Sequence, residues 1–107
     1  MTDHVLCDLD DIADGGSAAF TIDRTVIMAI RRGGDVFGYV NSCPHIGSPL
    51  DFTPGKFLTA DGAFILCSTH GALFRIADGH CVSGPCAGET LNPVYIAVHK
   101  NQVIATL

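Results

Sequence analysis

Turn signals divide this sequence into short segments, and that division restricts the fold more than any other feature. They occur at five places: Gly15-Gly16, Gly33-Gly34, Asp61-Gly62, Asp78-Gly79 and Lys100-Asn101. The segments between them are rich in Val, Ile, Phe and Thr, the residue types that favour strands. Short segments of this kind, separated by turns, predict an all-β domain.

Ten strands are expected, and the last two form a hairpin with a two-residue turn. They are predicted near residues 4–9, 18–23, 25–31, 36–41, 57–59, 63–67, 73–76, 80–82, 93–99 and 102–106. The stretch AFTIDRTVIMAI carries β-branched residues on both faces, which is typical of a strand that is buried on both sides. The same β-branched residues, followed by Gly33-Gly34, count against a helix at 25–32.

Length and charge restrict the class of protein. A chain of 107 residues fits one compact domain, residues 1–107. The net charge is −5 and the six basic residues are scattered, whereas a nucleic-acid interface needs clustered Lys and Arg. The start of the chain lacks the basic and apolar regions of a signal peptide, and the longest aliphatic run, VIMAI, is too short to span a membrane. We therefore expect a soluble, cytoplasmic protein that binds neither nucleic acid nor membrane.

The cysteines indicate metal or redox chemistry. There are five, an odd number, in a chain with no secretion signal, and this combination argues against a disulfide framework. Four of them lie between Cys43 and Cys86, and Cys7 stands apart.

Two stretches each contain one cysteine and one histidine. CPHIGSPL contains Cys43 and His45, and CSTHGALF contains Cys67 and His70. Zinc sites usually group Cys with Cys and His with His, and a Cys-x-His pair is too short to close comfortably on one ion. Two bridged irons remove this difficulty, because the cysteine and the histidine of one stretch can then bind different metal ions. One iron would bind both cysteines and the other would bind both histidines. That is the ligand arrangement of a Rieske [2Fe–2S] centre.

The pattern CPHIGSPL…CSTHGALF…GPC resembles the two cluster-binding loops and the proline loop of Rieske proteins, in particular the small Rieske-type ferredoxins. The resemblance implies a β-sandwich base domain with an inserted cluster-binding subdomain of loops and short strands, at about 42–87. It also implies that Cys43 and Cys67 bind the inner iron and that His45 and His70 bind the outer iron. By the same resemblance Pro85 shields the cluster from solvent.

The resemblance further implies a function. The family's small ferredoxins carry one electron from an NAD(P)H-dependent flavin reductase to a terminal oxygenase, by transient docking. Only 37 residues follow the last ligand, too few for the mononuclear iron domain of the oxygenase itself, so an electron carrier and not an enzyme is expected. The alternatives are a Rieske subunit held in a larger redox enzyme, similar to the small subunit of assimilatory nitrite reductases, and a structural zinc module.

Two residues predict a low reduction potential. High-potential Rieske proteins carry a serine soon after the second histidine and a tyrosine two residues further on, and by resemblance Ala72 and Phe74 stand at these positions. Neither side chain can donate a hydrogen bond to a sulfur, and such bonds tune the potential of the cluster. The first and second loops also lack the additional cysteines that form a disulfide in those proteins.

The other cysteines and histidines have less specific interpretations. Cys81 and Cys86 flank VSGP and are interpreted as reduced packing residues, with a disulfide that shields the cluster, or a redox pair, as alternatives. Cys7 lies on an expected strand and is interpreted as a core residue. His80 and His99 are expected at the surface.

Overall fold

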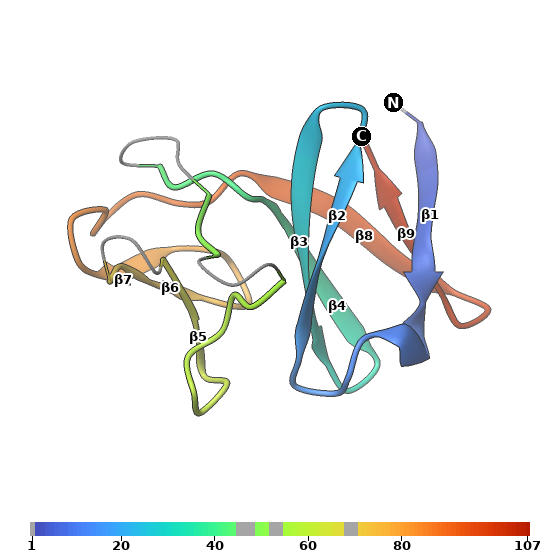
Figure 1. Ribbon diagram of the computed structural model, residues 1–107, viewed down its shortest axis with the longest axis horizontal. Coiled ribbons are helices and arrows are strands. Elements are labelled where there is room, and N and C mark those ends of the chain that lie inside the picture. The colour runs from blue at the N-terminus through green and yellow to red at the C-terminus, as the bar shows by residue number, and fades with distance from the viewer. Residues whose placement is uncertain (1, 45–48, 52–54, 68–70) are drawn as a thin grey trace.

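A computed structural model describes residues 2–44, 49–51, 55–67 and 71–107. In these parts of the chain, nine strands form two antiparallel sheets (Figure 1). The six-stranded sheet contains β1 (Asp3–Asp8), β2 (Ser17–Ile22), β3 (Thr25–Arg32), β4 (Asp35–Val40), β8 (Pro93–His99) and β9 (Gln102–Thr106), in the order β1-β9-β8-β4-β3-β2. The smaller sheet contains β5 (Phe64–Leu66), β6 (Leu73–Arg75) and β7 (Cys81–Ser83). The all-β fold class is confirmed.

The six-stranded sheet consists of two halves, β2-β3-β4 and β8-β9-β1. They meet where Gly38 and Tyr39 of β4 pair with Val94 and Pro93 of β8. A Cβ at Gly38 would lie 2.5 Å from Ile96 Cγ1, so the crossing of β4 and β8 requires glycine at this position. Ala29 and Val36 from one half and Val103 from the other pack together in one buried cluster with Leu9 and Ile12 of the connection between β1 and β2.

The smaller sheet is inserted between β4 and β8 in the sequence and packs on β3. Residues 27–30 of β3 are all fully buried. Ile27 and Ala29 join the clusters within the six-stranded sheet, whereas Met28 and Ile30 join a cluster that contains most of the buried residues of the smaller sheet and its loops. The prediction of a strand buried on both sides is therefore confirmed for β3. It is wrong for β2, where exposed positions interrupt the half-buried ones.

The expected strands differ from the structure mainly in the inserted region. The strand expected at 57–59 is a single bridge between Leu58 and Ile65, close to the Asp61-Gly62 turn. A short 3₁₀ helix (Leu9–Asp11) follows β1 and was not expected. The closing hairpin has the expected two-residue turn, because Lys100 and Asn101 both take positive φ angles, 49° and 63°. Within the residues described, no helix is both long and apolar enough to cross a membrane.

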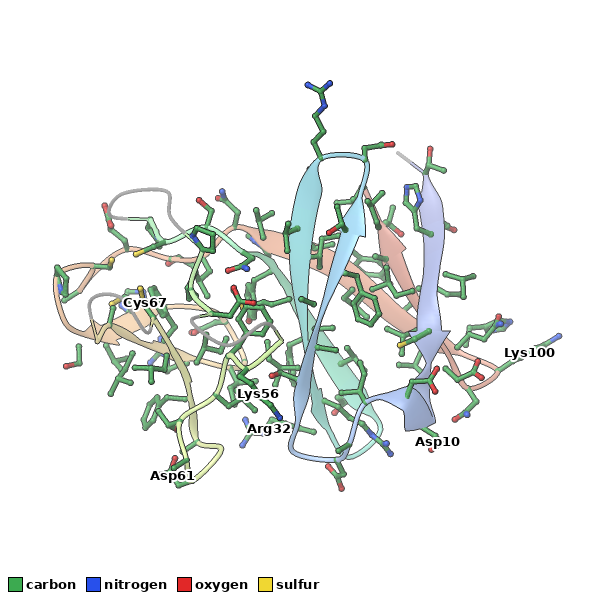
Figure 2. All side chains as sticks on the ribbon, in the orientation of Figure 1. Asp10, Arg32, Lys56, Asp61, Cys67 and Lys100 are labelled. Atoms are coloured by element: carbon green, nitrogen blue, oxygen red, sulfur yellow. The ribbon has the colours of Figure 1, made fainter. Side chains whose placement is uncertain are left out.

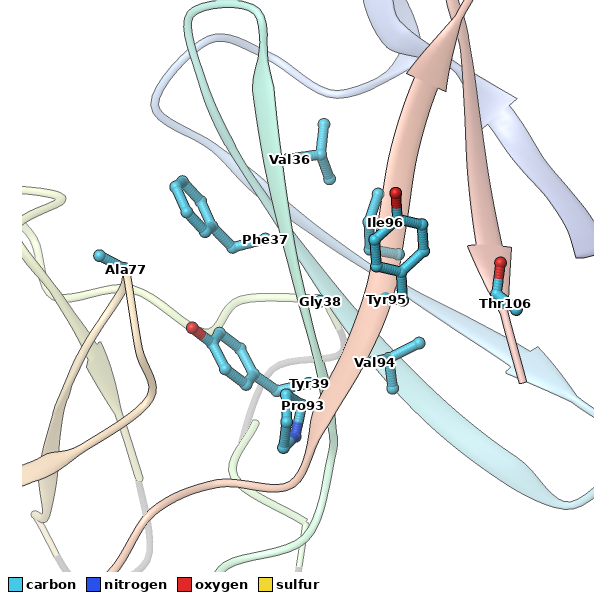
Figure 3. A pocket seen from close by; sticks show the side chains of 10 residues that line it. All are labelled: Val36, Phe37, Gly38, Tyr39, Ala77, Pro93, Val94, Tyr95, Ile96 and Thr106. Carbon is cyan, nitrogen blue, oxygen red and sulfur yellow. The ribbon is translucent and has the colours of Figure 1, made fainter. Parts of the chain in front are cut away.

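Tyr39 joins the six-stranded sheet to the inserted region. Its hydroxyl donates a hydrogen bond to the carbonyl oxygen of Ile76 at 2.5 Å, and its ring points from β4 toward the segment of Ala77 (Figure 3). A Cβ at Gly79 would lie 2.7 Å from Tyr39 Cε1, so the ring packs directly on that glycine. Burial, together with the negative charge of Asp78, raises the pKa of Tyr39 to about 12.

Replacing Tyr39 by phenylalanine is expected to lower the free energy of unfolding by about 1–2 kcal/mol, because the buried Ile76 carbonyl loses its donor. The folded-state pKa is raised above the ordinary value of 10.0, so the contribution of Tyr39 is fully present below pH 10 and is lost as the pH rises toward 12. Tyr39→Phe should remove this alkaline loss. Tyr95→Phe is the control, since Tyr95 is 71% exposed. Denaturant unfolding between pH 8 and 12 measures the free energy of unfolding of both variants. An equal loss of stability in the two variants would contradict the role given to the Tyr39 hydroxyl.

Candidate metal centre

Three loops meet beside the smaller sheet. The first loop (41–51) follows β4, the second loop (67–72) joins β5 to β6, and the third loop (82–88) begins within β7. Cys86 Sγ of the third loop lies 3.4 Å from Cys43 Sγ of the first loop. Gly84 of the third loop packs on the second, since a Cβ there would lie 2.8 Å from Ala72 Cα. The third loop therefore packs against both of the loops that carry the expected ligands.

Side-chain hydrogen bonds hold the two ends of the first loop together. Asn41 Oδ1 accepts from the backbone N–H of Leu50 at 2.7 Å, and Asn41 Nδ2 donates to Asp51 Oδ1 at 2.8 Å. Asp51 Oδ2 accepts from the backbone N–H of Gly55 at 3.0 Å. The backbone N–H of Asn41 also donates to the carbonyl oxygen of Val26, which anchors the loop on β3. These hydrogen bonds stabilise the backbone of the segment that contains Cys43.

Asp51→Asn is expected to loosen the first loop. The amide nitrogen of asparagine cannot accept a hydrogen bond, so one of the two bonds that Asp51 accepts, from Asn41 Nδ2 or from the Gly55 N–H, is lost. The expected loss is about 1–2 kcal/mol in the free energy of unfolding, with faster release of iron to a chelator. Asp10→Asn makes the same chemical change on a carboxylate that is 80% exposed, and it serves as the control. Equal rates of iron release in the two variants would contradict the role given to Asp51.

Backbone hydrogen bonds join the two described ends of the second loop, at the end of the β5–β6 hairpin. The N–H of Cys67 donates to the carbonyl oxygen of Ala72 at 2.9 Å, and the N–H of Gly71 donates to the carbonyl oxygen of Cys67 at 2.8 Å. Gly71 takes a φ of 69°, a left-handed conformation that favours glycine. These bonds place Cys67 opposite Ala72. Ala72 and Phe74 are both fully buried.

The structure places two of the four expected ligands. Cys43 and Cys67 are buried, with 1% and 0% exposure, and both belong to the apolar cluster that also contains Ala72, Phe74 and Cys86. Figure 2 shows Cys67 beside the smaller sheet, far from the Lys100 turn. His45 and His70 lie outside the described residues, and among the residues that are described no three His, Cys, Asp or Glu side chains are close enough to hold a metal ion.

The surroundings of the two cysteines fit an iron–sulfur cluster. Cys43 and Cys67 lie in an apolar cluster that excludes water from their sulfur atoms. Thiolate sulfur is the ligand that iron–sulfur clusters use, and the positive charge of iron stabilises a thiolate in such surroundings. Two buried cysteines from separate loops are therefore suited to the cysteine side of the expected [2Fe–2S] site.

The remaining cysteines are reduced and differ in their contacts. Cys81 and Cys86 do not form a disulfide with each other. Cys81 Sγ donates to the carbonyl oxygen of Ser83 at 3.2 Å, whereas Cys86 Sγ contacts Cys43 Sγ. The sequence indicates a packing role for Cys86 and does not predict its contact with Cys43; the only signal for this contact is the place of Cys86 in the proline loop.

Cys7, His80 and His99 lie in the described region and are not among the expected ligands. Cys7 is half-buried against the cluster of Leu9 and Val103, and burial, followed by the charges of Asp11 and Asp8, raises the pKa of its thiol. His99 is exposed as expected. His80 is half-buried, and its Nδ1 lies 3.4 Å from Thr90 Oγ1.

An all-β domain whose loops bring buried cysteines together at one place is the arrangement expected for an iron–sulfur protein of the Rieske class. Residues 2–101 match the family model of the Rieske [2Fe-2S] domain, and the chain belongs to this family. Membership implies a Rieske-type [2Fe–2S] cluster as the cofactor. No curated protein matches the sequence.

Solved structures share the fold over nearly the whole chain. The ferredoxin of carbazole 1,9a-dioxygenase from Nocardioides aromaticivorans IC177 is 24% identical, with a TM-score of 0.82 over 99% of this chain and 98% of that chain. The Sphingomonas yanoikuyae B1 ferredoxin is 25% identical, with a TM-score of 0.77 over 99% of both chains. The terminal oxygenase of carbazole 1,9a-dioxygenase from Novosphingobium sp. KA1 is 19% identical, with a TM-score of 0.84 over 98% of this chain but 29% of that chain. At these identities the likenesses show the fold.

Proposed function

We propose that this protein is a one-electron carrier that relays electrons from an NAD(P)H-dependent flavin reductase to a terminal oxygenase. The observation that carries the proposal is the pair of buried cysteines, Cys43 and Cys67, held by loops of a Rieske [2Fe–2S] domain. Similarity over almost the whole length of two ferredoxins supports a carrier rather than the oxygenase, of which the chain matches 29%. The protein then transfers an electron and catalyses no bond change itself.

The four ligands follow the family pattern. Cys43 and Cys67 bind the inner iron, and His45 and His70 bind the outer iron, within one domain, 1–107, whose cluster-binding part is about 42–87. When bound, the cluster supplies one-electron redox chemistry. The chain's own residues bury the two cysteine sulfurs, and the third loop lies over the second with Pro85 exposed at its surface. Electrons enter and leave through the edge that His45 and His70 form.

The partners are a reductase and an oxygenase that dock transiently, in the cytoplasm and away from membranes. The net charge of −5 favours partners with a basic docking surface, because opposite charges speed diffusional encounter. The same charge argues against nucleic acid as a partner, since its backbone is itself negatively charged.

Anaerobic stopped-flow measurements test the carrier function. The visible absorbance of purified protein should fall in part when it is mixed with NADH and a catalytic amount of a flavin-dependent ferredoxin reductase, and a Rieske oxygenase added to the reduced protein should restore it. The same mixture without reductase is the control. Stable co-elution of the chain with one large partner on gel filtration of the native protein would instead support a permanent subunit. Failure of the cluster to accept electrons from any such reductase would contradict the carrier.

A further inference from the structure

Cys86 places a third buried thiol directly against an expected ligand. Its Sγ lies 3.4 Å from Cys43 Sγ, a hydrogen-bonding separation for two sulfur atoms, and the residue is fully buried. Asp, Glu, Lys and Arg are absent from the buried residues of the described chain, so the surroundings of this sulfur pair are apolar. In such surroundings an electrostatic contact is less screened than in water.

The third loop holds Cys86 in place through its backbone. The N–H of Glu89 donates to the carbonyl oxygen of Cys86 at 2.8 Å, and the N–H of Cys81 donates to the carbonyl oxygen of Glu89 at 2.8 Å. Gly84, with a φ of 98°, fits so closely against Ala72 that a side chain at this position would collide with the second loop. The position of the Cys86 sulfur is therefore fixed against the first and the second loop.

We propose that the Cys86 thiol donates a hydrogen bond to Cys43 Sγ and so raises the reduction potential of the cluster. An iron-bound Cys43 is a thiolate and carries no proton, so Cys86 must be the donor in the pair. The bond strengthens when the cluster gains an electron, because the negative charge on the ligand sulfur increases, and this favours the reduced state. Cys86 is a positioning residue that acts through Cys43. Its hydrogen bond partly offsets the lowering of the reduction potential that follows from the absence of hydroxyl groups at Ala72 and Phe74.

A redox titration of three variants tests this role. Cys86→Ala removes the donor, and the equilibrium for reduction is expected to fall about three- to tenfold, equivalent to roughly 30–60 mV for one electron. Cys86→Ser keeps a donor and should hold the potential at or above the wild-type value. Cys81→Ala is the matched control, because its thiol is equally buried but donates to Ser83 and not to a ligand; its potential should equal that of the wild type.

Electron–nuclear double resonance of the reduced protein in D₂O gives a readout that a packing role would not change. One exchangeable deuteron coupled to the cluster should disappear in Cys86→Ala and persist in Cys86→Ser and Cys81→Ala. An unchanged potential in Cys86→Ala would overturn the proposal, as would an equal fall in Cys86→Ser. Loss of the cluster from Cys86→Ala would also overturn it, because Cys86 would then be required for holding the cluster and not for setting its potential.

The inference rests on the proposed assignment of Cys43 as a ligand, and the two can fail separately. If Cys43 is no ligand, Cys43→Ser keeps its cluster. If Cys43 is a ligand and Cys86 is no donor, the cluster of Cys86→Ala forms normally and titrates at the wild-type potential. Chemical mediators set the potential in these titrations, so the outcome is independent of whether a reductase and an oxygenase are the physiological partners.

Discussion

Replacing Cys67 or Cys43 by serine is expected to leave the protein without its [2Fe–2S] cluster. A serine hydroxyl at neutral pH is neutral and hard, whereas the proposed ligation of the inner iron needs a soft, charged thiolate at each of these buried positions. Iron per chain and the visible absorbance of the purified variant should fall to less than about a tenth of the wild-type values, because a soft ligand is lost from the iron. The same loss is expected for His45→Ala and His70→Ala, the proposed ligands of the outer iron.

Cys81→Ser provides the matched control for the ligand variants. Cys81 is as deeply buried as Cys43, with 1% exposure, and lies in the same apolar cluster, but its sulfur donates to the carbonyl oxygen of Ser83. This variant should retain its iron. A Cys67→Ser protein that keeps its full iron content and its colour would contradict the ligand assignment, as would a Cys81→Ser protein that loses both.

The double variant Ala72→Ser and Phe74→Tyr is expected to raise the reduction potential by about 100–250 mV. The two new hydroxyls would donate to sulfurs of the site, and each hydrogen bond to a charged group contributes roughly 1.5–3 kcal/mol. For one electron, a tenfold change in equilibrium corresponds to ~59 mV, which gives the stated range for two bonds. Ala72 and Phe74 are both fully buried, so no solvent water competes for the new donors.

Phe64→Tyr is the control for the double variant. This substitution adds a tyrosine hydroxyl in the same small sheet, but residue 64 lies at the far end of β5 from Cys67 and pairs with Arg75. The reduction potential of the Phe64→Tyr protein should remain at the wild-type value. If the double variant binds its cluster and has the same reduction potential as the wild type, then Ala72 and Phe74 do not explain the predicted low potential.

The fold was predictable from sequence because its signals are local. Short β-branched segments and turn pairs specify strands without reference to the rest of the chain, and the Lys100-Asn101 turn is an example that the structure confirms. The double burial of β3 was also readable, since Ile27 to Ile30 are apolar at every position. The alternation of β2 was misread because the same stretch continues through Asp23-Arg24 into a strand with a different environment.

The site was predictable only in part because its remaining contacts are not local. The ligand spacing predicts Cys43 and Cys67 as ligands, and the structure buries both in one cluster, while their binding of iron stays a prediction. The contact between Cys43 and Cys86 joins residues 43 positions apart, and it depends on how the third loop packs on the second. Likewise Asn41 and Asp51 are ordinary polar residues in the sequence, and only the folded chain shows that they close the first loop. The positions of His45 and His70 remain predictions.

A redox titration monitored by electron paramagnetic resonance tests the central claim most directly. The reduced protein should give a rhombic signal with an average g below the free-electron value, and the signal should appear near the lower end of the Rieske range of roughly −150 to +300 mV. The same signal near the upper end would contradict a low-potential carrier. Zinc in the purified protein, with no signal at any potential, would contradict electron transfer altogether.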